Sequence, residues 1–294
     1  MSAPAVPVAV EGVRFALHRS NPPRKRRTTP VLLLHGVPQT SAVWRPVVEE
    51  LARDRIVLAP DLKGLGQSEV RGPYDLTTLA REIAALILHE VDGEVDVVGH
   101  DWGGSVALAL AGTRPDLVRR LVVMSAPYKK VDLTRAWHIP LFALPAVPEA
   151  VIAAMGGGRL IGRMLDYAWR SDRELDPELR AEYMAAYDDS RRISAMLGYY
   201  RAAVRPRVLA PIAQLRGHEA PHLPAPKASS MLVVWGAADP VLPLRIGEAV
   251  AADLGPAARL VALPGVGHFV IDEAPEVVTE TIASFLRASD TEGA

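Results

Sequence analysis

Six short, nearly all-apolar runs constrain the fold of this 294-residue chain more than any other feature of its sequence. Each run has the length of a strand, and the stretches between the runs space their apolar residues as helices do. Strands without polar alternation fit a parallel sheet that helices cover on both faces. The alternating residues Val13, Phe15 and Leu17 predict an additional antiparallel strand at the edge of that sheet. The six runs occupy residues 31–36, 55–61, 95–100, 120–127, 230–239 and 258–265.

The rhythm of strand and helix stops near residue 127 and resumes near residue 230. The sequence in between has only the helical spacing of apolar residues, which predicts an inserted cap with the size of a small domain. We therefore expect an α/β core domain formed by residues 1–127 and 229–294, and a helical cap at residues 128–228. Ligands of such sheets bind at the carboxyl ends of the strands, so the site is expected at that edge.

The composition excludes several classes of function. The chain has 33 basic and 34 acidic residues and a formal net charge of −1, so no overall field draws it to nucleic acid. The basic run Arg24–Arg27 has no aromatic or second basic cluster beside it and is expected to be a solvated loop. Cysteine is absent, which excludes disulfides and thiolate chemistry. The N-terminus lacks the pattern of a secretory signal and no apolar run reaches about 18 residues, so we expect a cytoplasmic protein without a membrane partner.

The segment from Gly99 to Gly104 has the pattern of a sharp turn between a strand and a helix, with Asp101 at its apex. Such a turn leaves room only for small residues on either side of the apex, and Gly99 and Gly103 meet this requirement. The first N–H groups of the following helix stabilise an ionised carboxylate at the apex. The alternative is an aspartate that only caps the helix. The flanking glycines favour a reactive side chain that projects into a cleft.

A nucleophile at such a turn requires a base, and an acid that orients the base, each at the end of a later strand. His268 follows the run at 258–265 and is the best candidate for the base. Asp239 ends the run at 230–239, and its order along the chain assigns it as the orienting acid. We expect the backbone N–H groups of Val37 and Trp102, which lie beside the apex, to form an oxyanion hole.

Five segments resemble the α/β-hydrolase superfamily, and they occur in the order typical of that family. The resemblance covers nearly all of the chain and implies an α/β-hydrolase fold, with a mostly parallel sheet, flanking helices and an inserted helical cap. Within the superfamily, an aspartate at the apex resembles the epoxide hydrolase and dehalogenase branch. The segments are HGVP (35–38), PDLKGLGQSE (60–69), GHDWGG (99–104), WGAADPVLP (235–243) and GVGHF (265–269).

The carboxylate of Asp101 suits attack on a saturated carbon atom. The product is an ester that activated water can hydrolyse, whereas a serine would leave a stable ether. Attack of a carboxylate on an ester substrate would instead give a reactive anhydride. In the second step, His268 held by Asp239 would take a proton from water, and the water would attack the ester carbonyl. This chemistry needs no metal and no organic cofactor.

Opening an epoxide produces an alkoxide, which an acid on the cap must protonate. Epoxide hydrolases carry a ring-opening tyrosine in a WYR-like segment, and the resemblance assigns this role to Tyr200. Their second donor precedes a Phe-x-x-Pro element, and this position falls on His138; whether His138 donates a proton or only lines the pocket stays open. The other residues expected to line the substrate pocket are His35, Pro38, Trp137, Phe142 and Tyr199.

The expected reaction is the hydrolysis of a small apolar epoxide by water to a vicinal diol. A dehalogenase that uses the same two steps is the alternative, but haloalkane dehalogenases usually have Asn where this chain has Val37. Fluoroacetate dehalogenases have arginines at the positions of Trp102 and Ser105. A small-molecule receptor of the same fold would have no need for a hydrolytic base, and a serine esterase would need a serine in place of Asp101. The sequence leaves open whether the chain forms a homodimer.

Overall fold

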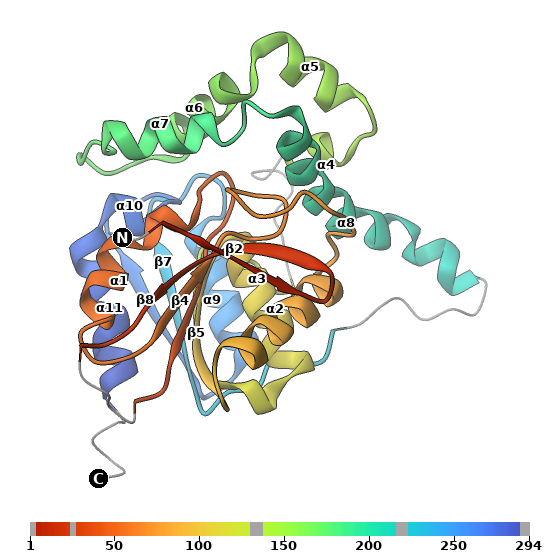
Figure 1. Ribbon diagram of the computed structural model, residues 1–294. Coiled ribbons are helices and arrows are strands. Elements are labelled where there is room, and N and C mark those ends of the chain that lie inside the picture. The colour runs from red at the N-terminus through yellow and green to blue at the C-terminus, as the bar shows by residue number, and fades with distance from the viewer. Residues whose placement is uncertain (1–3, 24–27, 130–137, 216–222, 289–294) are drawn as a thin grey trace.

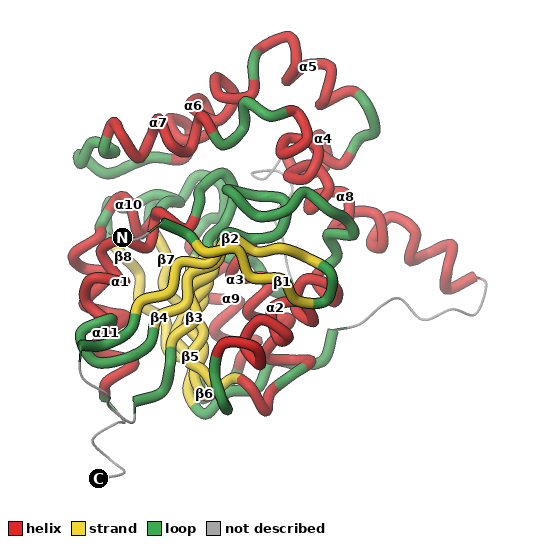
Figure 2. The backbone as a smooth tube through the Cα atoms, viewed as in Figure 1, coloured by secondary structure: helices red, strands yellow, loops and turns green. Residues whose placement is uncertain are grey.

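An eight-stranded sheet forms the centre of the protein (Figure 2). The computed structural model describes residues 4–23, 28–129, 138–215 and 223–288. The strand order is β1-β2-β4-β3-β5-β6-β7-β8, and the strands from β3 to β8 run parallel while β1 and β2 run antiparallel to their neighbours. The strands are β1 (Val6–Val10), β2 (Val13–Ser20), β3 (Val31–Leu34), β4 (Val57–Pro60), β5 (Val95–His100), β6 (Val118–Met124), β7 (Ser230–Gly236) and β8 (Ala258–Leu263).

Five of the six apolar runs contain one strand of the parallel part and the run 120–127 overlaps β6, so this prediction is confirmed. The prediction that the strand of Val13 to Leu17 lies at the edge is wrong, because β1 pairs on its outer side. The two strands form a hairpin whose turn residues, Glu11 and Gly12, have φ of 50° and 73°. Pro7 argues against a strand in the sequence, yet proline fits an edge strand that has no outer neighbour.

Helices cover both faces of the sheet (Figure 1). Helices α1 and α11 lie on one face, and α2, α3 and α9 lie on the other. Helix α3 is buried nearly all round, since it packs on β5 and β6 and also against α2. The helices of the core are α1 (Arg45–Leu51), α2 (Leu76–Glu90), α3 (Trp102–Thr113), α9 (Leu244–Leu254), α10 (Val270–Glu273) and α11 (Pro275–Arg287), with short 3₁₀ helices at Ser41–Trp44 and Pro115–Leu117.

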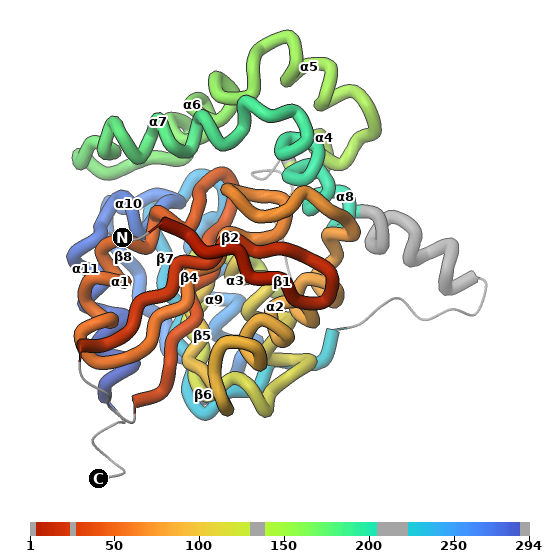
Figure 3. The backbone as a smooth tube through the Cα atoms, viewed as in Figure 1, coloured from red at the N-terminus to blue at the C-terminus, as the bar shows by residue number. Residues whose placement is uncertain are grey.

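Between β6 and β7 the described elements are all helices, and they lie over one edge of the sheet (Figure 3). The predicted domain boundaries at residues 127 and 229 fall in the connections before α4 and after α8. No helix in the described ranges is long and apolar enough to cross a membrane. The helices of this cap are α4 (His138–Ala143), α5 (Val147–Met155), α6 (Gly157–Ala168), α7 (Pro177–Ala185) and α8 (Ser190–Leu215).

Candidate active site

The turn between β5 and α3 holds Asp101 in a backbone conformation that side chains rarely adopt. Asp101 has φ 51° and ψ −119°, and its side chain makes no capping hydrogen bond to α3. The turn is tight, because a Cβ atom on Gly99 would lie 2.4 Å from the carbonyl oxygen of Gly103. A Cβ atom on Gly103 would lie 2.1 Å from the carbonyl oxygen of Leu34. Asp101 is therefore not a helix cap, and the strained turn presents its carboxylate at the carboxyl end of β5.

His268 and Asp239 follow β8 and β7, so the parallel sheet brings them to the same edge as Asp101. The Nδ1 atom of His268 lies 2.8 Å from Oδ2 of Asp239. The other oxygen of Asp239 accepts hydrogen bonds from the N–H groups of Val241 and Leu242, each over 2.8 Å. This fixes the carboxylate, which in turn fixes the imidazole with Nε2 facing Asp101 Oδ2 over 3.6 Å. The three side chains thus lie in the geometry that a nucleophile, its base and an orienting acid require, and their catalytic roles stay a prediction.

Charges in the site favour an ion pair between Asp101 and His268. Burial acts to lower the pKa of His268, but the charge of Asp239 and the interactions with both carboxylates outweigh it and raise the pKa to about 10. Burial acts to raise the pKa of Asp101, yet the neighbouring His268 holds it below its ordinary value. The free site therefore contains an imidazolium beside an ionised carboxylate. Because Asp101 helps to keep His268 protonated, a reaction that neutralises Asp101 lowers the pKa of His268.

One oxygen of Asp101 already faces a backbone donor. The N–H of Val37 donates to Asp101 Oδ1 over 2.9 Å, whereas Oδ2 is the oxygen that faces His268. Trp102 begins α3 directly after Asp101. The first N–H groups of a helix have no acceptor within the helix. That the backbone N–H of Trp102 contributes to an oxyanion hole stays a prediction.

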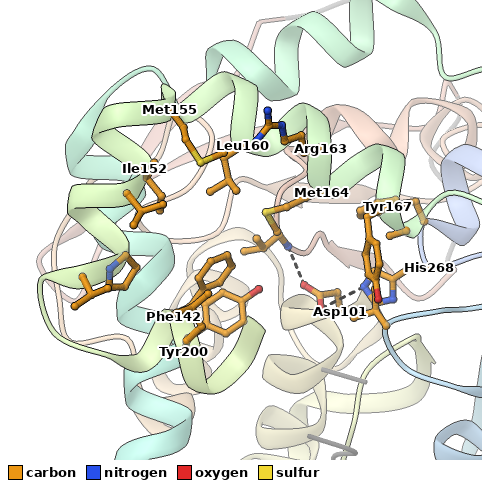
Figure 4. Close-up of a pocket in the computed structure, with 18 residues that line it drawn as sticks. Asp101, Phe142, Ile152, Met155, Leu160, Arg163, Met164, Tyr167, Tyr200 and His268 are labelled. Atoms are coloured by element: carbon orange, nitrogen blue, oxygen red, sulfur yellow. Dashed lines mark hydrogen bonds and ion pairs between the residues drawn. The ribbon is translucent and has the colours of Figure 1, made fainter. Parts of the chain in front are cut away.

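A cavity of about 400 Å³ lies between Asp101 and the cap helices (Figure 4). This volume suits a small organic ligand. Within the described residues, no group of three His, Asp or Glu side chains is arranged to hold a metal ion. The wall contributed by the cap is mainly apolar and includes Phe142, Ile152, Leu160, Met164, Tyr167 and Tyr200.

Tyr200 brings its hydroxyl group into the cavity from α8, and the hydroxyl oxygen points toward the Asp101 carboxylate (Figure 4). Its ring packs edge-on against Trp102 and Phe142, with ring centroids 5.2 Å apart in each pair. Burial and the charge of Asp101 raise the pKa of Tyr200, while a side-chain hydrogen bond from Trp102 acts to lower it. The indole N–H is the only polar group that the Trp102 side chain has to donate. Tyr200 is therefore protonated in the free site, and the indole stabilises its phenolate form.

Comparison with known proteins identifies the family. A model of the alpha/beta hydrolase fold matches residues 29–275. The chain belongs to this family. This hydrolase is similar to the AB hydrolase superfamily protein YfhM of Bacillus subtilis (28% identical, covering 87% of this chain and 90% of YfhM), and to a soluble epoxide hydrolase of Corynebacterium sp. (29% identical, covering 87% and 89%). The solved structure of the epoxide hydrolase CorEH matches with a TM-score of 0.76 and 26% identity, covering 97% of this chain and 98% of that chain.

Three of the predicted pocket residues of this hydrolase, His35, Pro38 and Tyr199, do not line the cavity. His35 is fully buried, and its Nε2 accepts a hydrogen bond from the N–H of Leu62 over 2.9 Å. Pro38 is buried in the same loop. The hydroxyl of Tyr199 donates to the carbonyl oxygen of Lys63 over 2.7 Å. Adjacent residues of a helix point about 100° apart, and of the two neighbouring tyrosines of α8 only Tyr200 lines the cavity.

The structure places Phe142 in the lining of the cavity. Trp137 lies outside the described residues. The backbone of His138 begins α4, but its side chain lies outside the described part of the structure. The role of His138 as a second donor therefore stays a prediction.

Helix α6 supplies lining residues that the sequence analysis does not assign. Leu160, Met164 and Tyr167 face the cavity at a spacing of four and then three residues, and Arg163 lies beside them. The spacing was a usable signal, because it places these side chains on one face of a helix. The pattern alone does not say whether that face meets a cavity or a packed core.

A buried chain of hydrogen bonds connects the loop of His268 with the cap. His100 Nε2 lies 2.9 Å from the carbonyl oxygen of His268, and His100 Nδ1 lies 2.9 Å from Oε1 of Gln39. The amide of Gln39 donates to Asp272 Oδ2 over 2.7 Å, and the hydroxyl of Tyr183 on α7 lies 3.3 Å from both oxygens of Asp272. The pKa of Asp272 is raised from 3.8 to about 7, mainly because the carboxyl group is buried. The hydrogen bonds from Gln39 and Tyr183 act to lower this pKa but do not outweigh the burial.

Replacing Asp272 with Asn should make the stability of the hydrolase less dependent on pH. The folded chain holds the proton of Asp272 up to about pH 7, whereas the unfolded chain releases it near pH 3.8. Between these values the folded state binds more protons, so the wild type loses stability as the pH rises, by up to about 1.4 kcal/mol per pH unit. The measurement is urea unfolding of both proteins at about pH 4.5 and about pH 7.5. The free energy of unfolding of the variant minus that of the wild type should be larger at the higher pH. A difference that is the same at both pH values would contradict the raised pKa.

Proposed function

We propose that this α/β hydrolase converts an epoxide to a vicinal diol through an ester formed on Asp101. The observation that carries the proposal is the Tyr200 hydroxyl, which faces the Asp101 carboxylate in one apolar cavity (Figure 4). Ring opening requires this pair, because the ring carbon is attacked while the departing oxygen takes a proton. The likeness to a soluble epoxide hydrolase of Corynebacterium sp. supports the same reaction.

In the first step, Oδ2 of Asp101 attacks an epoxide carbon and the carbon–oxygen bond of the ring breaks. Tyr200 gives its proton to the departing oxygen, and the hydrogen bond from Trp102 stabilises the phenolate that remains. Oδ1 becomes the carbonyl oxygen of the ester and keeps the hydrogen bond from the Val37 N–H. The products are a neutral ester on Asp101, a hydroxyl group on the substrate and a phenolate.

The proton on His268 passes to the Tyr200 phenolate at the end of this first step. Ester formation removes the charge of Asp101, which is one of the causes that raise the pKa of His268. The imidazolium therefore becomes more acidic, and its proton passes to the Tyr200 phenolate. His268 is then neutral and can act as a base, so the same event that makes the ester prepares the group that hydrolyses it.

In the second step, neutral His268 takes a proton from water, and the water oxygen attacks Cγ of Asp101. Negative charge grows on Oδ1, where the N–H of Val37 already donates. The ester bond then breaks, and the departing oxygen of the diol takes the proton of the new carboxylic acid. Asp101 and the His268 imidazolium are restored, and one oxygen of Asp101 has come from water.

Two observations weigh against dehalogenation. A halide would need a second donor beside the indole of Trp102. The side chain at Val37 has no N–H group that could serve as the second halide donor. The positions of Trp102 and Ser105 also lack the arginines that would bind a haloacetate.

A substrate panel tests the proposal. Terminal, aryl and bulky polycyclic epoxides are incubated with the enzyme beside chloroacetate and fluoroacetate, and diol formation and halide release are measured. We expect diol from at least one epoxide and no halide, with no activity in the Asp101→Ala control. Halide release without diol would support the dehalogenase, and ligand binding without any product would support a receptor.

A further inference from the structure

Arg163 is the one permanently cationic residue among the described residues that line the cavity. It is exposed on α6, and Figure 4 shows it with Met155 at the upper end of the cavity while Asp101 lies at the lower end. Within the described ranges no carboxylate pairs with it. Other arginines of the cap do have such partners, since Arg180 lies 2.9 Å from Asp166 and Arg201 lies 2.7 Å from Glu149.

The space between the two ends is apolar. Leu160 and Met164 of α6 lie between Arg163 and the Asp101 carboxylate, and Ile152 of α5 lines the same cavity to their side (Figure 4). Val147 and Val151 line the same cavity and are also exposed to solvent, so its lining stays apolar where it meets solvent. A ligand that fills this space therefore has an apolar body. The guanidinium of Arg163 lies at the outer end of the cavity, where it can contact the far end of that ligand.

The two ends also differ in the charge that they accept. Asp101 is ionised and buried at the inner end, so an anionic group of the substrate placed there would be repelled. A guanidinium binds carboxylates strongly, through paired N–H donors that match the two oxygens. An acidic group would thus enter last and stay at Arg163, while the uncharged epoxide ring reaches Asp101.

We propose that the preferred substrate is an amphiphilic epoxide acid, with its carboxylate bound by Arg163 and several methylene groups between the carboxylate and the ring. This inference rests on the proposed function, and it adds an anionic outer end to the apolar substrate. Epoxide acids whose carboxylate adjoins the ring are poor substrates, because they would place two negative charges beside each other at Asp101.

The test compares a fatty acid that carries a terminal epoxide with its methyl ester, in the wild type and in Arg163→Gln. The acid should show a KM raised roughly ten-fold in the variant with kcat nearly unchanged, because one charge-assisted contact far from the reacting atoms is lost. The methyl ester should respond less than two-fold, by the same reasoning. Arg163→Lys should recover part of the loss for the acid.

Arg159 provides a matched control. It is exposed on the same helix, one turn before Arg163, and it does not line the cavity. Arg159→Gln changes the net charge of the cap equally, so it should leave the KM of both compounds unchanged. An equal loss in the two variants, or an equal response of acid and ester in Arg163→Gln, would overturn the proposal.

A binding experiment separates this proposal from the proposed function. The saturated fatty acid and its methyl ester carry no epoxide, and their affinity is measured by titration calorimetry on the wild type, Arg163→Gln and Arg159→Gln. We expect the acid to bind more weakly to Arg163→Gln alone. If the wild type opens no epoxide, the proposed function fails, while the calorimetry still decides whether Arg163 binds the carboxylate.

Discussion

Replacing His268 with Gln should stop the hydrolase after its first step and leave one substrate molecule bound to Asp101. Alkylation uses the carboxylate of Asp101 and the proton of Tyr200, whereas hydrolysis needs a base that glutamine cannot supply. Steady-state turnover should fall by at least roughly 10²-fold, as expected for the loss of a general base. The mass of the intact protein should rise by the mass of one substrate molecule, and peptide mapping should locate the addition on Asp101.

Two controls make this experiment decisive. The double variant Asp101→Ala/His268→Gln should show no added mass, since no carboxylate remains at the turn. Wild-type enzyme cycled in heavy-oxygen water should gain label in Asp101, because hydrolysis leaves a solvent oxygen in its carboxylate. An unchanged mass for His268→Gln, in the presence of an active wild type, would refute the ester mechanism.

The sequence was sufficient for those parts of the site that depend on order along the chain. Parallel strands end at one edge of the sheet, so residues that follow β5, β7 and β8 must come close to each other. The positions of Asp101, Asp239 and His268 therefore follow from strand order. The turn at Asp101 was also predictable, because glycine is the only residue that fits beside its tight backbone.

The remaining parts depend on packing between segments that are distant in the sequence. Gln39 and Asp272 are 233 residues apart and neither lies in a recognisable pattern, so their buried hydrogen bond had no sequence signal. The resemblance singles out Tyr200 as the acid, but the sequence also predicts that Tyr199 lines the pocket. Tyr199 does not line the cavity, because the orientation of α8 relative to the core turns it toward Lys63. The position of Arg163 in the cavity lining had no sequence signal for the same reason, because it depends on how α6 packs over the core.

Replacing Tyr200 with Phe should slow ring opening by roughly 10²- to 10⁴-fold, the range typical for the loss of a general acid. The phenyl ring keeps the packing against Trp102 and Phe142, so only the hydroxyl group is removed. Single-turnover alkylation in the His268→Gln background measures this step alone.

Tyr199→Phe is the matched control, because it removes a hydroxyl group from the adjacent position of the same helix. The hydroxyl of Tyr199 donates to the carbonyl oxygen of Lys63 outside the cavity, so its loss should lower the free energy of unfolding by about 1 kcal/mol without slowing alkylation. If Tyr200→Phe alkylates as fast as the parent, the departing oxygen takes its proton from another group. His138 at the start of α4 would then be the next residue to replace, and a slow His138→Phe variant would transfer the acid role to it.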